Sequence, residues 1–579
     1  MQKVLIGRKS SRADGVVIAL TLAGIYALVA YGREFESAFH TAVDIDLSFY
    51  SLPYYTLFSA LRGMAAFMLS LTFTLIVGYW AAKSPRAERI LIPVLDILQS
   101  IPVLGFLPGL VLVLLALFPH TNAGLELACI LMIFTGQVWN MTFSFYASLK
   151  SVPSDFKEVS SIIGLTSLEK LRKVELPFAA MNLVWNSLLS MSGGWFFLSV
   201  CEAFTLGDHQ YRLPGIGAYM ATAIASGNVS AMIGGVVAMS LLIVFMDILI
   251  WRPVLAWAHQ FRLEDIPGFT TTEPLMANLV RESGLLRWAK LAYRRRTLHR
   301  SLVKRTEKYS PVMLRIDPRR FIRSKAGYNA VTRGTGWLII SVLLALASYG
   351  TFRLIVTLIH VSPSVWATLL AGTGLTFLRV FACLFLGSIW TVPLGIWIGT
   401  SPRRIRVAQP LVQVLASFPA PMLYPLALGA IFVFHIPFGV GAMFLMMLGV
   451  QWYILFNVLA GAMRIPVELR YAAFLMNVSR TDLWKRLYLP SVFPALVTGW
   501  VTAAGGAWNA SIVAEYLSYN GSVLTTRGLG SLISVAASSK NFPMLAACLT
   551  MMVIVVILLN RTVWARIYQL AQTRFRMDL

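Results

Sequence analysis

Long apolar segments alternate with short polar ones along most of the chain. A transmembrane helix needs roughly 20 mostly apolar residues, and about twelve segments reach this length. They lie near residues 15–33, 54–81, 90–118, 124–147, 177–206, 228–251, 336–359, 371–399, 407–434, 438–460, 491–518 and 542–560. The ten-residue alternation typical of membrane β-barrels is absent. The pattern predicts an all-α polytopic membrane protein.

The composition supports this prediction. Hydrophobic residues make up 57% of the 579 residues, charged residues 13%, and the mean hydropathy is +0.71, which is well outside the range of soluble domains. The four cysteines fall in predicted spans without CxxC spacing, and we expect them to be apolar packing residues. They are Cys129, Cys201, Cys383 and Cys548.

The net charge of +24 does not indicate a nucleic-acid partner, because basic residues cluster in alternate inter-helix segments. Lys83, Arg86 and Arg89 follow the second span, whereas segment 34–50 carries four acidic residues and no Lys or Arg. By the positive-inside rule, both termini are expected in the cytoplasm. The basic start could instead be a secretory signal. We prefer a retained helix, since the run from Val16 is long enough to span and no clear A-x-A site follows.

The chain contains an internal repeat. An offset of 313 relates Trp139 to Trp452, Pro177 to Pro490 and Glu202 to Glu515, and an offset of 317 relates Arg62 to Arg379. Each half would hold six spans and enter the membrane in the same direction, which predicts a parallel repeat with a pathway between the halves. We expect halves at 1–252 and 336–579. The linker 253–335 has 17 basic and 6 acidic residues, and we expect it to lie on anionic lipid, with a soluble partner as the alternative.

A polar segment recurs between spans four and five of each half. In the first copy, Glu158–Ile163 and Ser167–Glu175 are expected to form two short helices joined at Gly164, a residue that tolerates positive φ. Asn477 replaces Gly164 in the second copy and is the next most tolerant residue. Such a helix pair could dock into a groove on a soluble motor. Alternatively, it is an amphipathic loop resting on the bilayer.

These residues resemble the EAA motif of binding-protein-dependent ABC import permeases, whose pattern is roughly EAA, three residues, G, nine residues and I-x-L-P. The first copy matches in Glu158, Gly164 and Val174-x-Leu176-Pro177, and the second in Ala472, Ala473 and Leu487-x-Leu489-Pro490. The second copy departs at Tyr471 and Asn477, which suggests two non-equivalent contacts. The chain looks most like the nitrate, sulfonate and taurine class, here as a duplicated type I permease.

The resemblance implies a location in a bacterial inner membrane, coupling to two ATPase subunits and delivery of substrate by an external solute-binding protein. It also implies a small anion such as nitrate, a sulfonate, taurine or bicarbonate as substrate. No GxxxxGK[ST] phosphate loop occurs, so we expect ATP and Mg²⁺ on partner chains and no catalytic residue, cofactor or metal on this one. The implied coupling residues are Glu158, Ser160, Ser161, Gly164, Leu165, Thr166, Leu168, Tyr471, Ala472, Ala473, Asn477, Val478 and Ser479.

Charged residues within spans are candidates for the pathway. Arg62 and Arg379 could attract an anion, or could snorkel to the external interface. Glu202 and Glu515 could line the pathway or bond to neighbouring helices. We favour snorkelling for the two arginines and bonding to neighbouring helices for the two glutamates.

Two other classes of protein remain as alternatives. A major-facilitator-type secondary transporter also has six plus six spans, but it typically carries its charged motif between spans two and three. A membrane-embedded enzyme is less favoured, because the seven His are scattered and no nucleophile constellation is evident.

Overall fold

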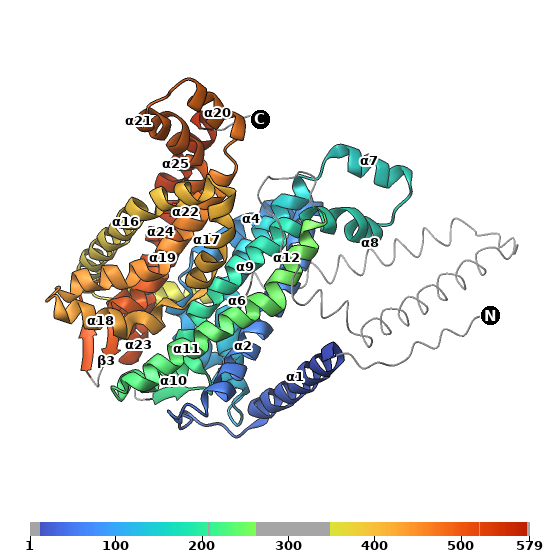
Figure 1. Ribbon diagram of the computed structural model, residues 1–579. Coiled ribbons are helices and arrows are strands. Elements are labelled where there is room, and N and C mark those ends of the chain that lie inside the picture. Colours follow the sequence, from blue (N-terminus) through green and yellow to red (C-terminus); the bar gives the residue numbers. More distant parts are fainter. Residues whose placement is uncertain (1–11, 207–208, 262–344, 346–347, 520–521, 576–579) are drawn as a thin grey trace, which may run out of the picture. The chain divides into compact units, whose positions relative to one another are not determined.

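The computed structural model describes residues 12–206, 209–261, 345, 348–519 and 522–575 (Figure 1). Most of the basic linker therefore lies outside the described residues. The chain divides into two compact units, Met1–Ala23 with Leu275–Pro363, and Gly24–Pro274 with Ser364–Leu579. The second unit contains nearly all of both predicted halves, and the sites below lie within it.

The first half contains α1 (Arg12–Glu36), α2 (Leu52–Phe73), η1 (Thr74–Gly78), α3 (Tyr79–Lys83), α4 (Pro85–Ser100), η2 (Val103–Phe106), α5 (Leu107–Leu117), α6 (Ala123–Lys150), α7 (Ser154–Ile162), α8 (Ser167–Lys170), η3 (Leu171–Glu175), α9 (Leu176–Cys201), β1 (Ala203–Leu206), β2 (His209–Arg212), α10 (Ile216–Ala225), α11 (Val229–Met246), η4 (Asp247–Trp251) and α12 (Arg252–His259).

The second half repeats this order. It contains α16 (Pro363–Gly399), α17 (Pro402–Ser417), η5 (Ala420–Leu423), α18 (Tyr424–Val433), α19 (Phe438–Met463), α20 (Val467–Leu475), α21 (Arg480–Asp482), η6 (Leu483–Tyr488), α22 (Leu489–Ala514), β3 (Tyr516–Tyr519), β4 (Ser522–Thr525), α23 (Leu529–Ser538), α24 (Phe542–Leu559), η7 (Asn560–Trp564) and α25 (Ala565–Arg574).

Within the described residues, eight helices are long and apolar enough to cross a membrane, or ten if each of two bent pairs is one span. These ten correspond to ten of the twelve expected spans. Of the other two, the first falls on α1, and the seventh overlaps the apolar helix Ser348–Ile359. The nearly all-helical membrane fold predicted from the sequence is thus confirmed.

The third and ninth expected spans are not straight helices. Their two parts are bent by 84° in the first half and 86° in the second. Each bend precedes a proline, Pro102 or Pro419, and the residue before it, Ile101 or Phe418, has extended φ and ψ angles. Proline disfavours helical geometry in the preceding residue and donates no amide hydrogen bond. The sequence analysis predicted the length of each apolar segment but not the bend within it.

Two antiparallel hairpins and two short helices were not predicted. β1 pairs with β2 and β3 with β4, and α10 or α23 follows directly. In Figure 1 the hairpins and these helices lie at the opposite end of the second unit from α7, α8, α20 and α21.

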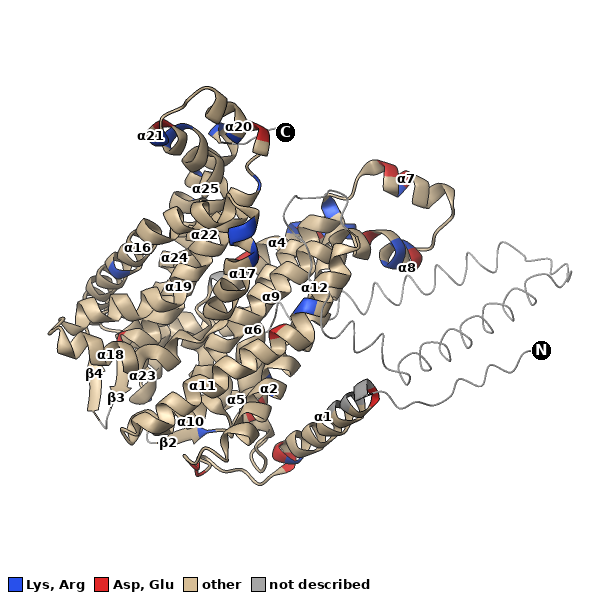
Figure 2. Cartoon of the chain, in the orientation of Figure 1, with Lys and Arg blue, Asp and Glu red and all other residues tan. Residues whose placement is uncertain are grey.

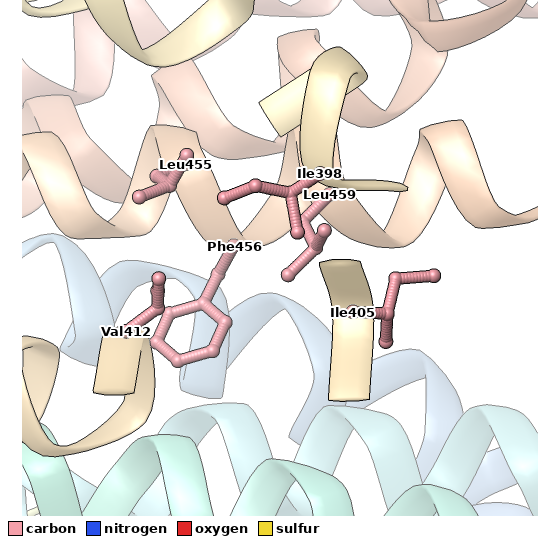
Figure 3. Packing of buried hydrophobic residues seen from close by; sticks show 6 residues of the cluster. All are labelled: Ile398, Ile405, Val412, Leu455, Phe456 and Leu459. Carbon is pink, nitrogen blue, oxygen red and sulfur yellow. The ribbon is translucent and has the colours of Figure 1, made fainter. Parts of the chain in front are cut away.

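The core consists of helix pairs that pack in the same way in both halves, α6 on α9 and α19 on α22. Figure 3 shows one buried cluster, in which side chains from the end of α16, from α17 and from α19 meet. Its members are Ile398, Ile405, Val412, Leu455, Phe456 and Leu459. The four cysteines are free and buried, as expected of packing residues.

Candidate functional site

The echoed polar segments form two helical elbows, defined here as residues 154–175 and 467–488. In the first elbow, Gly164 ends α7 with φ +72°, and in the second, Asn477 ends α20 with φ +47°. The predicted positive-φ turns are therefore confirmed in both copies. Figure 1 shows both elbows projecting from the same end of the second unit.

The second short helix of each elbow begins with the same capping chemistry. The Thr166 hydroxyl accepts a hydrogen bond from the amide of Glu169, and the Glu169 carboxylate accepts one from the amide of Thr166. In the second elbow, the Ser479 hydroxyl accepts from the amide of Asp482. These bonds satisfy amides that the first helical turn leaves without partners, so the elbows have defined local structure.

The tips of the elbows expose large apolar side chains. Ile162 and Ile163 are 83% and 67% exposed, and their repeat equivalents Leu475 and Met476 are 78% and 77% exposed. Figure 2 shows charged residues on the same elbows, whereas the long helices are mostly uncharged. An apolar tip with a charged rim is typical of a surface that docks another protein.

Most of the predicted coupling residues lie on this exposed surface. Ser160 is the exception, because it is buried and its hydroxyl donates to the carbonyl of Lys157. Leu165 and Ala473 are half-buried, and the rest are exposed, namely Glu158, Ser161, Gly164, Thr166, Leu168, Tyr471, Ala472, Asn477, Val478 and Ser479.

Arg62, on α2, is fully buried among two carboxylates. Its Nε donates to Glu126 Oε2 at 2.8 Å and its Nη2 to Glu126 Oε1 at 2.5 Å, while Nη1 donates to the Glu202 carboxylate. Both terminal nitrogens also reach the carbonyl of Pro214. The hydroxyl of Tyr31 donates to Glu126 at 2.8 Å. The guanidinium is thus hydrogen-bonded through all three of its nitrogens.

Arg379 occupies the equivalent position on α16 with different partners. Its Nη1 donates to Glu515 Oε1 at 2.7 Å, but its Nε donates to the backbone carbonyl of Gly439 at 2.9 Å. Gly439 is the repeat equivalent of Glu126 under the offset of 313. The second half therefore has one carboxylate where the first has two, and the Arg379 side chain is 12% exposed instead of 0%.

Both functions considered for these arginines from the sequence require a guanidinium that reaches solvent. Arg62 has no exposed surface, so in this structure it neither snorkels nor faces a solvent-filled pathway. Glu202 and Glu515 bond to neighbouring elements, which is the alternative that we favoured. The Arg379 side chain is 12% exposed, so this argument applies to Arg62 alone. The function proposed below uses no pathway role for these four residues.

The two glutamates also hold the short helices α10 and α23. Glu202 accepts from the amide of Gly217 at 2.7 Å, and Glu515 from the amide of Gly530 at 2.9 Å, so each carboxylate sits at a helix N-terminus. A Cβ on Gly215 would lie 2.3 Å from the Glu202 carboxyl carbon, and one on Gly528 would lie 2.1 Å from Glu515 Oε2. The repeated glycines let the backbone approach the carboxylate closely.

Glu126 was missed in the sequence analysis. The available signal was an acidic residue inside an apolar span, which is costly unless paired. Its repeat equivalent is a glycine, so the repeat gave no indication of its importance.

A cavity of about 230 Å³ lies between the halves within the second unit. The first half contributes residues near the Pro102 bend and on α6, including Trp139 and Asn140, and the second contributes α22 and η7, including Ala504 and Trp564. Trp139 thus lines the cavity, whereas its repeat equivalent Trp452 packs against the cluster of Figure 3.

Comparison with known families decides the class of protein. The model of the binding-protein-dependent transport system inner membrane component matches twice, at residues 74–250 and 391–576, which together cover more than half of the chain. The chain belongs to this family. The two matches confirm that it is a duplicated ABC importer permease, and they favour this class over the facilitator and enzyme alternatives.

Similar proteins carry related descriptions. A putative ABC transporter permease protein of Methanocaldococcus jannaschii is 28% identical over 209 residues, which are 35% of this chain and 74% of that protein. The nitrate import permease protein of Leptolyngbya laminosa is 31% identical over 140 residues, 24% of this chain and 49% of its own length. The taurine transport system permease protein of Escherichia coli is 26% identical over 197 residues, 34% of this chain and 67% of its own. The chain thus spans about half of the nitrate permease and more of the other two.

Proposed function

We propose that the two fused halves form the translocation pathway of an ATP-driven importer, and that the elbows at 154–175 and 467–488 dock two separate ATPase subunits. A solute-binding protein would deliver substrate at the opposite, external end. The chain itself would hydrolyse nothing, because ATP would be bound by its partners. This arrangement places the elbows and both termini in the cytoplasm of a bacterial cell.

The observation that carries the proposal is the matched exposure at the tips of the elbows. Four large apolar side chains at repeat-related positions, Ile162, Ile163, Leu475 and Met476, are each at least 67% exposed. Covering exposed apolar side chains with a partner lowers the free energy of the complex, because it removes apolar surface from water. The positive φ at Gly164 and Asn477 gives both elbows the same sharp turn between their short helices.

The proposed substrate is a small anion. The names of similar proteins support this class, since they include permeases for nitrate, taurine, bicarbonate and aliphatic sulfonates.

Co-purification tests the coupling. The chain is expressed together with candidate ABC ATPase subunits from the same genome, and Ile162→Asn and Leu475→Asn are made singly and together. Because each variant removes an apolar contact from one elbow, we expect each to lower ATPase recovery and the pair to abolish it. Lys173→Gln is the control, since Lys173 is 61% exposed on the same elbow but away from its tip. Unchanged ATPase recovery with the double variant would contradict the proposal.

A further inference from the structure

A stripe of exposed apolar side chains runs along α16 and ends at a tryptophan. Phe385, Ile389 and Trp397 are each more than half exposed, and their spacings of four and eight residues place them on one side of the helix. Trp397 lies at the elbow end of α16, because Arg470 of α20 donates to the carbonyl of Thr400, three residues further on. In a membrane-spanning helix, such a stripe faces lipid, and a tryptophan at its end is typical of the membrane surface.

The start of α17, directly after this tryptophan, carries two adjacent arginines. The guanidinium carbon of Arg404 lies 4.6 Å from the centroid of the Trp397 ring, and Arg403 is exposed. Val407 and Leu411 follow Arg403 at intervals of four residues and are 77% and 61% exposed, so they continue the same face of α17. This face therefore begins with positive charge and continues with apolar side chains.

The charge at the start of α17 is not balanced by acidic side chains. Within the part of the chain that the structure describes, no carboxylate forms an ion pair with Arg403 or Arg404. The equivalent helix of the first half, α4, has Ala87 in place of Arg404 and Glu88 in place of Ile405. Its start thus carries one basic residue fewer and one acidic residue more.

The apolar part of this face is common to both halves. Ile90 and Val94 of α4 correspond to Val407 and Leu411 under the offset of 317, and they are also exposed. The two faces therefore offer the same kind of surface to acyl chains. They differ in the charge that they present at the membrane surface.

We propose that Arg403, Arg404 and Trp397 bind the headgroup of one anionic phospholipid. Its acyl chains would lie along Val407 and Leu411. Guanidinium groups donate charge-assisted hydrogen bonds to phosphate oxygens, and clustered basic residues at a membrane surface attract anionic lipid. An acidic protein surface would match the charge but not the apolar side chains that follow it into the membrane. Such a site would bind lipid whether or not the elbows dock an ATPase.

Native mass spectrometry of the delipidated full-length chain tests the site. The probes are phosphatidylglycerol and phosphatidylcholine with the same acyl chains, and we expect the wild type to bind the anionic lipid at least tenfold more tightly. Each basic residue near an anionic surface contributes about fivefold in affinity. The double variant Arg403→Gln with Arg404→Gln should therefore bind phosphatidylglycerol at least tenfold more weakly. The control is Arg86→Gln with Arg89→Gln, which removes two charges from the equivalent helix and should stay within twofold of the wild type.

Several outcomes would overturn the site. These are equal binding of the two lipids to the wild type, unchanged affinity for phosphatidylglycerol in the Arg403 and Arg404 double variant, and displacement of the bound lipid by excess inorganic phosphate. If the double variant does not elute as a folded protein, Arg403→Gln alone decides, with an expected loss of about fivefold. ATPase recovery is measured on the same samples and should not change. Lower recovery with unchanged lipid binding would assign the two arginines to a protein partner instead.

Discussion

Replacing Arg62 with methionine tests the buried cluster of the first half. The change keeps an unbranched side chain of similar length but removes the guanidinium that donates to Glu126 and Glu202. Glu202 would keep bonds from the Ser59 hydroxyl and the Gly217 amide, whereas Glu126 would keep only that from Tyr31. The variant therefore leaves two buried carboxylates without their cation.

Removing one partner of a buried ion pair typically costs 3–5 kcal/mol, so we expect Arg62→Met to lower the free energy of unfolding by at least about 4 kcal/mol. Arg379→Met should cost less, about 1–3 kcal/mol. Its guanidinium is partly exposed and contacts one carboxylate, and Glu515 keeps bonds from Thr376, Gly530 and Ser531. The two repeat-related variants are thus expected to differ.

The assay is unfolding of the detergent-solubilised chain, followed by fluorescence-detected size exclusion after heating. The double variant Arg62→Met with Glu126→Gln removes one of the stranded charges and should recover part of the loss. Equal stability of Arg62→Met and the wild type would refute the reasoning, as would a larger loss in Arg379→Met than in Arg62→Met.

Three further predictions concern local geometry. Gly164→Val forces a β-branched residue to adopt φ +72°, so we expect a cost of about 1–2 kcal/mol and lower ATPase recovery, whereas Asn477→Gly should recover as much ATPase as the wild type. Gly215→Ala places a methyl group on the Glu202 carboxylate and should reduce the yield of folded protein, while Gly109→Ala, where a Cβ meets nothing within 4 Å, should not. Thr166→Ala removes the cap of α8, which costs about 1 kcal/mol, and limited proteolysis should cut the first elbow faster than in the wild type.

The elbows were predictable from the sequence because they interrupt apolar segments with polar residues and because Gly164 and Asn477 tolerate the same unusual backbone angle. The bends before Pro102 and Pro419 could have been predicted from the effect of proline on the preceding residue, but segment length alone concealed them. Of the two partners of Arg62, Glu202 was singled out by the repeat, whereas Glu126 was missed because the repeat aligns it with a glycine. The cavity was equally unpredictable, because it depends on which side chains, Ala504 among them, are too short to fill a packed interface.

Fusion of the two halves has a consequence for the whole transporter. Two identical subunits related by a twofold axis must present the same residue on both sides of that axis. A single polypeptide has no such obligation, and here Glu126 faces one arginine while Gly439 faces the other. Joining the copies thus allowed the arginine of one half to bind two carboxylates and that of the other half only one. A homodimer cannot have this asymmetry.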